Sequence, residues 1–184
     1  MLTEIQKILQ EKSDSKAKES FQKFIPSSQN VYGVRVPILN ELAKNYKAGG
    51  FELVEELWKS NITEEKLLAT KILGKVCKKD PDRAMEIVLR FSKDISDWAV
   101  CDTLATQGVR GILKIKQKEI FDLAKKFVKS DYMWQRRIGI VLLINYSKDI
   151  NSRNEIRRII KPLQDDKEHY IKKAIIWIEK SLKK

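Results

Sequence analysis

The chain has 184 residues, of which 42% are hydrophobic and 34% charged, and its formal net charge is +12. This length fits one domain with an extended core, and the seven Gly and four Pro allow few turns, which argues against a sandwich or barrel. The charge is uneven, because residues 1–102 carry 17 Lys and Arg against 16 Asp and Glu, whereas residues 103–184 carry 20 against 9. A basic half is typical of proteins that bind DNA, RNA or an anionic membrane, although a lysine-rich composition explains it as well.

The apolar residues follow a helical spacing along the whole chain, and no segment alternates as a strand does. An Asp before a helix can cap its free N–H groups, so Asp80 is predicted to cap a helix that opens with Pro81, and Asp131 and Asp166 to cap two later helices. The longest irregular connection is predicted over residues 26–37. Helix starts are predicted near Leu2, Asp14, Pro37, Phe51, Thr63, Pro81, Asp97, Lys116, Tyr132, Ser152 and Lys167.

Aromatic residues recur at a spacing of 36 residues in the second half of the chain, at Trp98, Trp134 and Tyr170. A fixed period of this size is typical of stacked helix pairs. We therefore predict an all-α, HEAT-like helical-repeat solenoid of about five stacked antiparallel helix pairs, forming a single domain over residues 1–184. The second helix of each pair is expected to form a concave face. Equivalent positions would line that shared surface, which makes neighbours of Trp98, Asp102, Trp134, Arg137 and Trp177.

The remaining composition predicts a cytoplasmic protein without a metal or other cofactor. Cys77 and Cys101 lie on helical patterns without a zinc spacing, which favours buried thiols in a reducing compartment. The N-terminus has no apolar signal region and no run reaches the length of a membrane span. The sequence has no Gly-rich phosphate loop and no Ser-His or Cys-His spacing signature, and His169 is predicted to lie at the surface. An enzyme of this composition would work by electrostatics and positioning.

Trp98 and Asp102 are four residues apart, so a helix places them on one face about one turn from each other. A carboxylate beside an indole can stabilise a cation or a developing positive charge; the alternative is a core Trp with a solvated Asp at its rim. Trp177 is flanked by Lys172 and Lys173, and this residue also fits a plain core position.

Arg136 and Arg137 lie near the start of a helix, where cations oppose the positive end of the helix dipole. A bound phosphate would make both arginines favourable, because the free N–H groups and the guanidinium groups attract an anion. The alternative is an ion pair with Asp97, Asp102 or Asp131, and the sequence leaves both interpretations open.

Four segments together resemble a known family. They are Y-G-V-R-V-P-I-L-N-E-L-A-K from Tyr32, D-W-A-V-C-D-T-L from Asp97, M-W-Q-R-R-I-G-I from Met133 and K-K-A-I-I-W from Lys172. In this order they resemble the AlkD-like DNA alkylation repair enzymes, which are HEAT-like helical-repeat DNA glycosylases. The resemblance covers most of the chain.

The resemblance implies hydrolysis of the N-glycosidic bond of positively charged alkylated purines, such as 3-methyladenine and 7-methylguanine, in double-stranded DNA. It assigns Asp102 as the catalytic carboxylate, Trp98 and Trp177 as aromatic walls, and Arg137 as a contact to the DNA backbone. We expect a monomer, and the expected DNA-binding set is Arg137, Arg136, Trp134, Lys172 and Lys173.

Two departures and two alternatives accompany this interpretation. The sequence ends seven residues after Trp177, where the family usually continues with further helix, and Lys180 stands in place of the arginine that follows the last Trp of the family. Both departures predict a smaller DNA-contacting surface. The alternatives are a non-catalytic helical-repeat module that binds nucleic acid through its basic half, and a protein scaffold.

Overall fold

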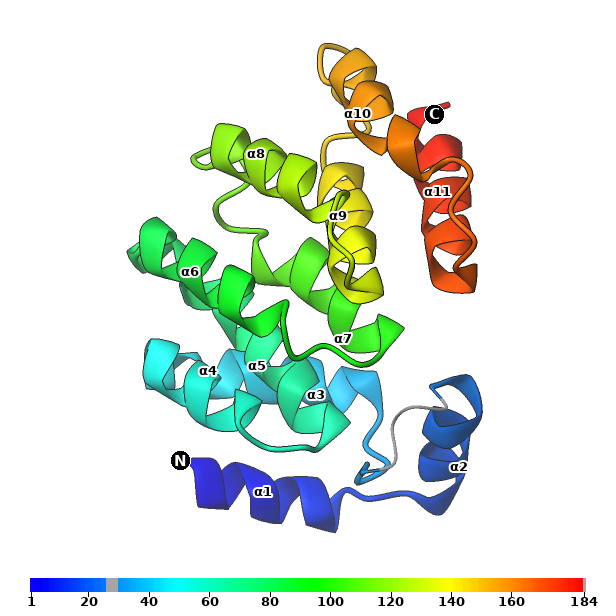
Figure 1. The fold of residues 1–184 in the computed structure, drawn as a ribbon. Helices are drawn as coiled ribbons and strands as arrows, with labels where there is room; N and C mark the ends of the chain where they lie inside the picture. Colours follow the sequence, from blue (N-terminus) through cyan, green and yellow to red (C-terminus); the bar gives the residue numbers. More distant parts are fainter. Residues whose placement is uncertain (26–29, 184) are drawn as a thin grey trace. The chain divides into compact units, whose positions relative to one another are not determined.

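The computed structural model describes residues 1–25 and 30–183, and within these ranges every regular element is a helix (Figure 1). The prediction of an all-α helical-repeat fold is confirmed. The α-helices are α1 (Leu2–Glu11), α2 (Ser15–Phe24), α3 (Val36–Asn45), α4 (Gly50–Trp58), α5 (Thr63–Val76), α6 (Pro81–Phe91), α7 (Trp98–Thr103), α8 (Gln117–Phe127), α9 (Met133–Ile144), α10 (Arg153–Ile160) and α11 (His169–Leu182). Short helical turns, η1 (Lys47–Gly49), η2 (Cys77–Lys79), η3 (Leu104–Gly108) and η4 (Lys161–Leu163), follow α3, α5, α7 and α10.

Every helix begins within two residues of its predicted start, but the caps differ from the prediction at two places. Asp80 caps α6, since its carboxylate accepts the N–H of Arg83 at 3.0 Å. The predicted caps at Asp131 and Asp166 are wrong, because α9 and α11 begin at Met133 and His169 without a side-chain cap. Asp131 lies one residue before the N-cap of α9, Tyr132, and Asp166 lies two residues before the N-cap of α11, Glu168. Part of the predicted connection, residues 26–29, lies outside the described residues.

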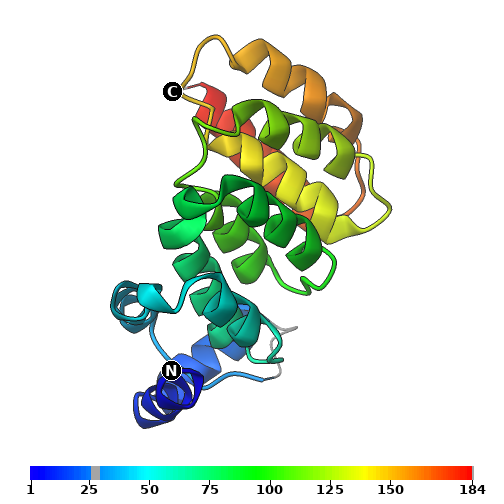
Figure 2. The same ribbon diagram turned by 90° about the vertical axis from the view of Figure 1, so that its left-hand side faces the viewer.

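The helices group into two compact units, residues 1–111 with α1 to α7 and residues 112–184 with α8 to α11. We call them unit 1 and unit 2 and describe each by itself. In unit 1 the central helix is α5, which packs against α3, α4, α7 and η3. In unit 2 the central helix is α9, which packs against α8 and α11; Figures 1 and 2 show α8 alongside α9. Each unit thus contains a packed pair of successive helices, α4 with α5 and α8 with α9, and each central helix also packs against a helix two places away in the chain, α3 or α11.

Two buried glutamates at the start of α5 hold the segment before α3 in place. Glu64 is fully buried, and its carboxylate accepts the backbone N–H groups of Tyr32, Gly33 and Val34 at 3.2, 2.7 and 3.1 Å. Glu65 accepts the phenolic O–H of Tyr32 at 2.7 Å. Burial and this bond raise the pKa of Tyr32. Buried carboxylates are tolerated where hydrogen bonds satisfy them, so this pair fixes residues 32–34, just before α3.

Gly33 is required within this held segment. Its φ of 89° lies in the left-handed region, and a Cβ there would approach the carbonyl oxygen of Asp14 to 2.5 Å. Any side chain at this position would therefore disturb both the backbone conformation and the contact with the start of α2.

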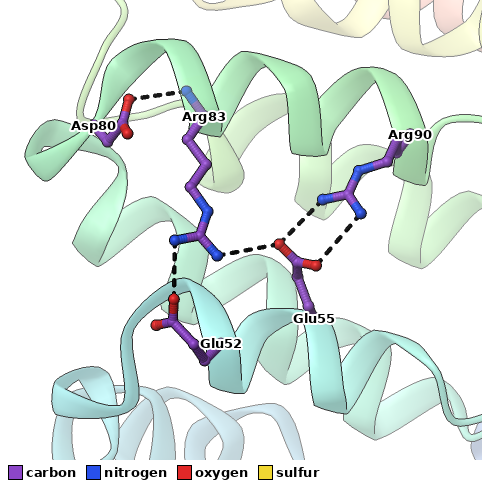
Figure 3. Close-up of polar contacts among 5 residues, drawn as sticks. All are labelled: Glu52, Glu55, Asp80, Arg83 and Arg90. Atoms are coloured by element: carbon purple, nitrogen blue, oxygen red, sulfur yellow. Dashed lines mark hydrogen bonds and ion pairs between the residues drawn. The ribbon is translucent and has the colours of Figure 1, made fainter.

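Ion pairs join α4 to α6 on the surface of unit 1 (Figure 3). The guanidinium of Arg83 contacts Glu52 at 2.9 Å and Glu55 at 3.4 Å, and Arg90 contacts Glu55 at 3.1 Å. The hydrogen bond from Arg90 lowers the pKa of Glu55, and Arg83 adds to this effect. Exposed ion pairs are screened by solvent and add little to the free energy of unfolding, so the network orients the two helices more than it stabilises them.

Several expectations for single residues are confirmed. Cys77 and Cys101 are buried free thiols, and His169 is exposed. Among the helices of the described ranges, none is both long and apolar enough to cross a bilayer.

Candidate active site

Helix α7 begins at Trp98 because Asp97 caps it. The Asp97 carboxylate accepts the N–H of Val100 at 2.9 Å and is only 5% exposed. Burial raises the pKa of Asp97, although the N–H groups of Val100 and Ala99 and the charge of Lys66 oppose this rise. The cap fixes the first turn of α7, and with it the positions of Trp98 and of Asp102 one turn later.

Trp98 and Asp102 line one cavity of unit 1, with a volume of about 400 Å³ and a mainly apolar wall. We call it the apolar cavity. Helix α2 contributes Phe21 and Phe24 to its wall, and α5 contributes Leu67 and Lys71, with further lining from Ser20, Ile25, Val36, Ala99, Thr103 and Gln107. Pockets of this size with a few polar groups in an apolar wall are typical of sites that bind a flat organic group.

The Trp98 side chain ties α7 to the end of α2. Its indole Nε1 donates to the carbonyl oxygen of Phe24 at 2.9 Å, while the Phe24 ring itself is 64% exposed. An aromatic ring at the edge of an apolar cavity with most of its surface in water is available to a ligand that enters the cavity. Trp98 therefore forms part of the cavity wall and also holds the C-terminal end of α2 through its hydrogen bond to Phe24.

The turn after Asp102 widens into a π-helical turn, η3. Turns of this kind are rare and frequent at functional sites. The structure allows η3 to approach α5 closely because Gly74 has no side chain; a Cβ there would lie 2.0 Å from the carbonyl oxygen of Gln107. The hydroxyl of Thr106 donates to the Asp102 carbonyl at 2.7 Å and closes the turn. This geometry brings Gln107 to the wall of the cavity.

In unit 2 the guanidinium of Arg136 forms hydrogen bonds with three residues of the protein. Its Nε donates to the Asp166 carboxylate at 2.9 Å, and its Nη1 donates to the carbonyl oxygens of Ser130 and Asp131 at 3.0 and 2.9 Å. The ion-pair alternative thus applies to Arg136, with Asp166 as the carboxylate in place of those considered from the sequence. Arg136 joins the loop before α9 to the loop before α11.

Trp134 and Arg137 both contact the start of α11. Trp134 is 7% exposed, and its ring centroid lies 5.0 Å from that of Tyr170. These two aromatics of the 36-residue period therefore pack directly on each other. Arg137 is 5% exposed, and its guanidinium donates to the carbonyl oxygen of Tyr170. A role of either residue in DNA binding stays a prediction.

Helix α11 presents the remaining predicted residues to solvent. Lys172 and Lys173 are exposed, and Trp177 is 39% exposed. Lys173 and Trp177 are four residues apart and so share one face of the helix. This arrangement differs from a core position for Trp177, and it suits contact with an anionic partner.

Apart from Trp98 and Asp102, the residues of the apolar cavity were not predicted from the sequence, and these include Phe21, Phe24, Lys71 and Gln107. One signal was available: Lys71 interrupts an apolar stretch of α5 in which nearly every residue is buried. No sequence signal marks Phe21 or Phe24, because their helix has no buried residue. Within the described ranges no group of three or more His, Cys, Asp or Glu could hold a metal ion.

The family model described as DNA alkylation repair enzyme matches residues 5–182, which is nearly the whole chain. A search of curated proteins finds no match.

Proposed function

The chain belongs to the DNA alkylation repair enzyme family, and from this premise we propose that it hydrolyses the N-glycosidic bond of positively charged alkylated purines in DNA. The family places the protein in the repair of alkylated DNA. The choice of reaction and substrate is our inference. The observation that carries it is the joint presence of the Asp102 carboxylate and the Trp98 indole in the wall of one apolar cavity.

The chemistry of the substrate matches what this cavity offers. A purine alkylated at N3 or N7 carries a positive charge, so it is already a good leaving group. As its bond to the sugar breaks, positive charge develops on the sugar. A carboxylate about 4 Å from that charge contributes about 4 kcal/mol at an effective dielectric constant near 20. Asp102 would supply this charge and hold the attacking water.

Aromatic side chains favour a cationic base over a neutral one. An indole face attracts a cation by about 0.5–2 kcal/mol. Trp98 would supply this face in unit 1, and we propose the exposed Trp177 on α11 as an aromatic contact of unit 2 with the DNA. Lys172, Lys173 and Arg137 are the proposed contacts to the DNA backbone in unit 2.

The test is base release from duplex DNA that carries a single 7-methylguanine, with a matched duplex that carries O6-methylguanine, which is uncharged. We expect the purified protein to release 7-methylguanine and to leave the uncharged lesion in place. Binding of both duplexes without release of either base would favour a non-catalytic nucleic-acid-binding module. Absence of binding to any duplex would favour a protein scaffold.

A further inference from the structure

Lys71 lines the apolar cavity together with Asp102, yet the proposed hydrolysis does not use it. It lies on α5, the central helix of unit 1, and is only 6% exposed. A buried ammonium group is costly unless a carboxylate pairs with it. Within the described parts of the chain, Lys71 forms no ion pair with a carboxylate. Its position therefore calls for a chemical explanation.

Two neutral side chains hold the Lys71 amine. Its Nζ donates to the amide oxygens of Asn40 and Gln107 at 2.8 and 3.0 Å. The two hydrogens of a neutral amine are enough for both bonds. The ammonium form has a third hydrogen, for which the described residues provide no acceptor. Loss of one proton therefore keeps both bonds and leaves a lone pair on Nζ.

The surroundings of Lys71 favour this neutral form. Burial lowers the pKa of Lys71, and the charge of Lys75, one turn later on α5, lowers it further. A carboxylate partner would have the opposite effect, because it would stabilise the ammonium form. A lysine that is desolvated and lies near another cation is an activated nucleophile.

The product of the proposed hydrolysis is an electrophile for such an amine. Removal of the base leaves an abasic sugar, whose ring opens to an aldehyde at C1′. In the proposed reaction Asp102 acts at C1′, and Asp102 and Lys71 lie in the wall of one cavity. Ring opening frees C1′ to turn from Asp102 towards Nζ, and this step requires no base in the cavity.

We propose that Lys71 forms an imine with C1′ of the abasic site and that the protein then cleaves the DNA strand by β-elimination. This inference rests on the proposed function. The lone pair of Nζ attacks C1′, and water leaves as the iminium forms. The Asp102 carboxylate takes a proton from C2′, and the electron pair of that bond forms an enamine. The C3′–O bond then breaks, and its electron pair leaves with the phosphate of the following nucleotide. Water hydrolyses the unsaturated iminium and returns Lys71 as the free amine.

The experiment supplies the abasic site directly. A duplex with one uracil is converted to an abasic duplex by a uracil-DNA glycosylase, which is removed before the protein and sodium cyanoborohydride are added. This reagent reduces an imine to a stable secondary amine, so an imine appears as a covalent protein–DNA adduct on a denaturing gel. The proteins are wild type, Lys71→Met, Lys71→Arg and the control Lys79→Met. Lys79 is exposed in η2, directly after α5, and lies outside the apolar cavity.

We expect wild type and Lys79→Met to form the adduct and, without the reductant, to cleave the abasic strand, whereas Lys71→Met and Lys71→Arg do neither. Arginine keeps the positive charge but its guanidinium stays protonated, so the Lys71→Arg result separates the nucleophile from the charge. Digestion of the wild-type adduct and mass spectrometry identify the modified residue without any variant, which covers the case of a variant that does not fold.

Three results would overturn the proposal: no adduct with wild type, an adduct on an amine other than Lys71, or an adduct of wild-type yield with Lys71→Met. The assay does not depend on base release. If wild type releases no 7-methylguanine but forms the adduct at Lys71, the proposed hydrolysis fails and the strand cleavage stands. If wild type releases 7-methylguanine, forms no adduct and leaves the strand intact, the strand cleavage fails and the proposed hydrolysis stands.

Discussion

The two units divide charge and chemistry between them. Unit 1 carries 18 Lys and Arg against 16 Asp and Glu, and unit 2 carries 19 against 9. The nearly neutral unit nevertheless contains the apolar cavity, with Asp102 and the buried Lys71 in its wall. The strongly basic unit uses two of its arginines, Arg136 and Arg137, for contacts within the protein. Net charge therefore indicates a class of partner, whereas the location of a site depends on where a few charges are buried.

The largest expected effect on stability distinguishes two tryptophans of unit 1, Trp58 in the core and Trp98 in the wall of the apolar cavity. Trp58 is 6% exposed and stacks on Phe91 with ring centroids 3.8 Å apart. Trp58→Ala should lower the free energy of unfolding by about 3–5 kcal/mol because it leaves a cavity. Trp98→Ala should lower the free energy of unfolding less than Trp58→Ala does, since Trp98 lines a cavity that already exists. It should reduce base release more than Trp58→Ala does. Urea unfolding and base release of both variants check this, and equal losses of stability would contradict the distinction.

The next effect concerns the buried carboxylate that holds the chain before α3. Glu64→Gln replaces one accepting oxygen by an NH₂ group, which faces either the N–H groups of Gly33 and Val34 or the N–H of Tyr32. We expect a loss of about 2 kcal/mol in the free energy of unfolding. The matched control is Glu56→Gln on the exposed face of α4, which should stay within about 0.5 kcal/mol of wild type. A Glu64→Gln protein as stable as the control would show that this anchor is unimportant.

A smaller effect distinguishes the exposed lysines of unit 2 from its buried arginine. If Lys172 and Lys173 each neutralise one phosphate, each Lys→Ala change should lower the slope of log affinity against log salt by about 0.9 and leave stability unchanged. Arg137→Ala should in addition lower the melting temperature, because the bond to the Tyr170 carbonyl is lost. Salt titrations and thermal unfolding of the three variants measure both quantities. An unchanged slope for both lysine variants would remove α11 from the proposed DNA surface.

The smallest effect is a pH dependence of opposite sign at two helix caps of unit 1. The hydrogen bond from Ala17 and the charge of Arg35 lower the pKa of Asp14, so Asp14 adds stability above its ordinary value of 3.8 that is lost as pH falls. Burial raises the pKa of Asp97, so the ionised form is penalised and the contribution of Asp97 to stability declines as pH rises from 3.8 through the raised pKa.

Urea unfolding of Asp14→Asn and Asp97→Asn between pH 3 and 6 measures the two contributions. Asparagine keeps a capping oxygen, so both variants should remain folded over this pH range. As the pH rises, Asp97→Asn should gain stability relative to wild type. Asp14→Asn should lose stability relative to wild type over the same range. The same pH trend in both variants would contradict the assignment.

The sequence predicted the helices well because helix starts and apolar periodicity are local properties. Trp98 and Asp102 were found from a spacing of four residues, which one short helix converts into proximity. Lys71 and Phe24 could not be assigned to the same cavity, because their meeting depends on the packing of α2, α5 and η3 across long stretches of chain. The two wrong caps at Asp131 and Asp166 have a related cause. Arg136 donates to the Asp166 carboxylate and to the Asp131 carbonyl, which fixes the loops before α11 and α9, and local capping rules do not include such bonds.

The most direct test of the central claim is Asp102→Asn in single-turnover release of 7-methylguanine, with a binding isotherm for the same duplex. Asparagine keeps the size of the side chain and removes its charge, and that charge acts mainly as the glycosidic bond breaks. We expect release to slow about a thousandfold, the loss that corresponds to about 4 kcal/mol, while the affinity for DNA stays the same or rises. Release by Asp102→Asn at the wild-type rate would contradict the assignment of Asp102 as the catalytic carboxylate.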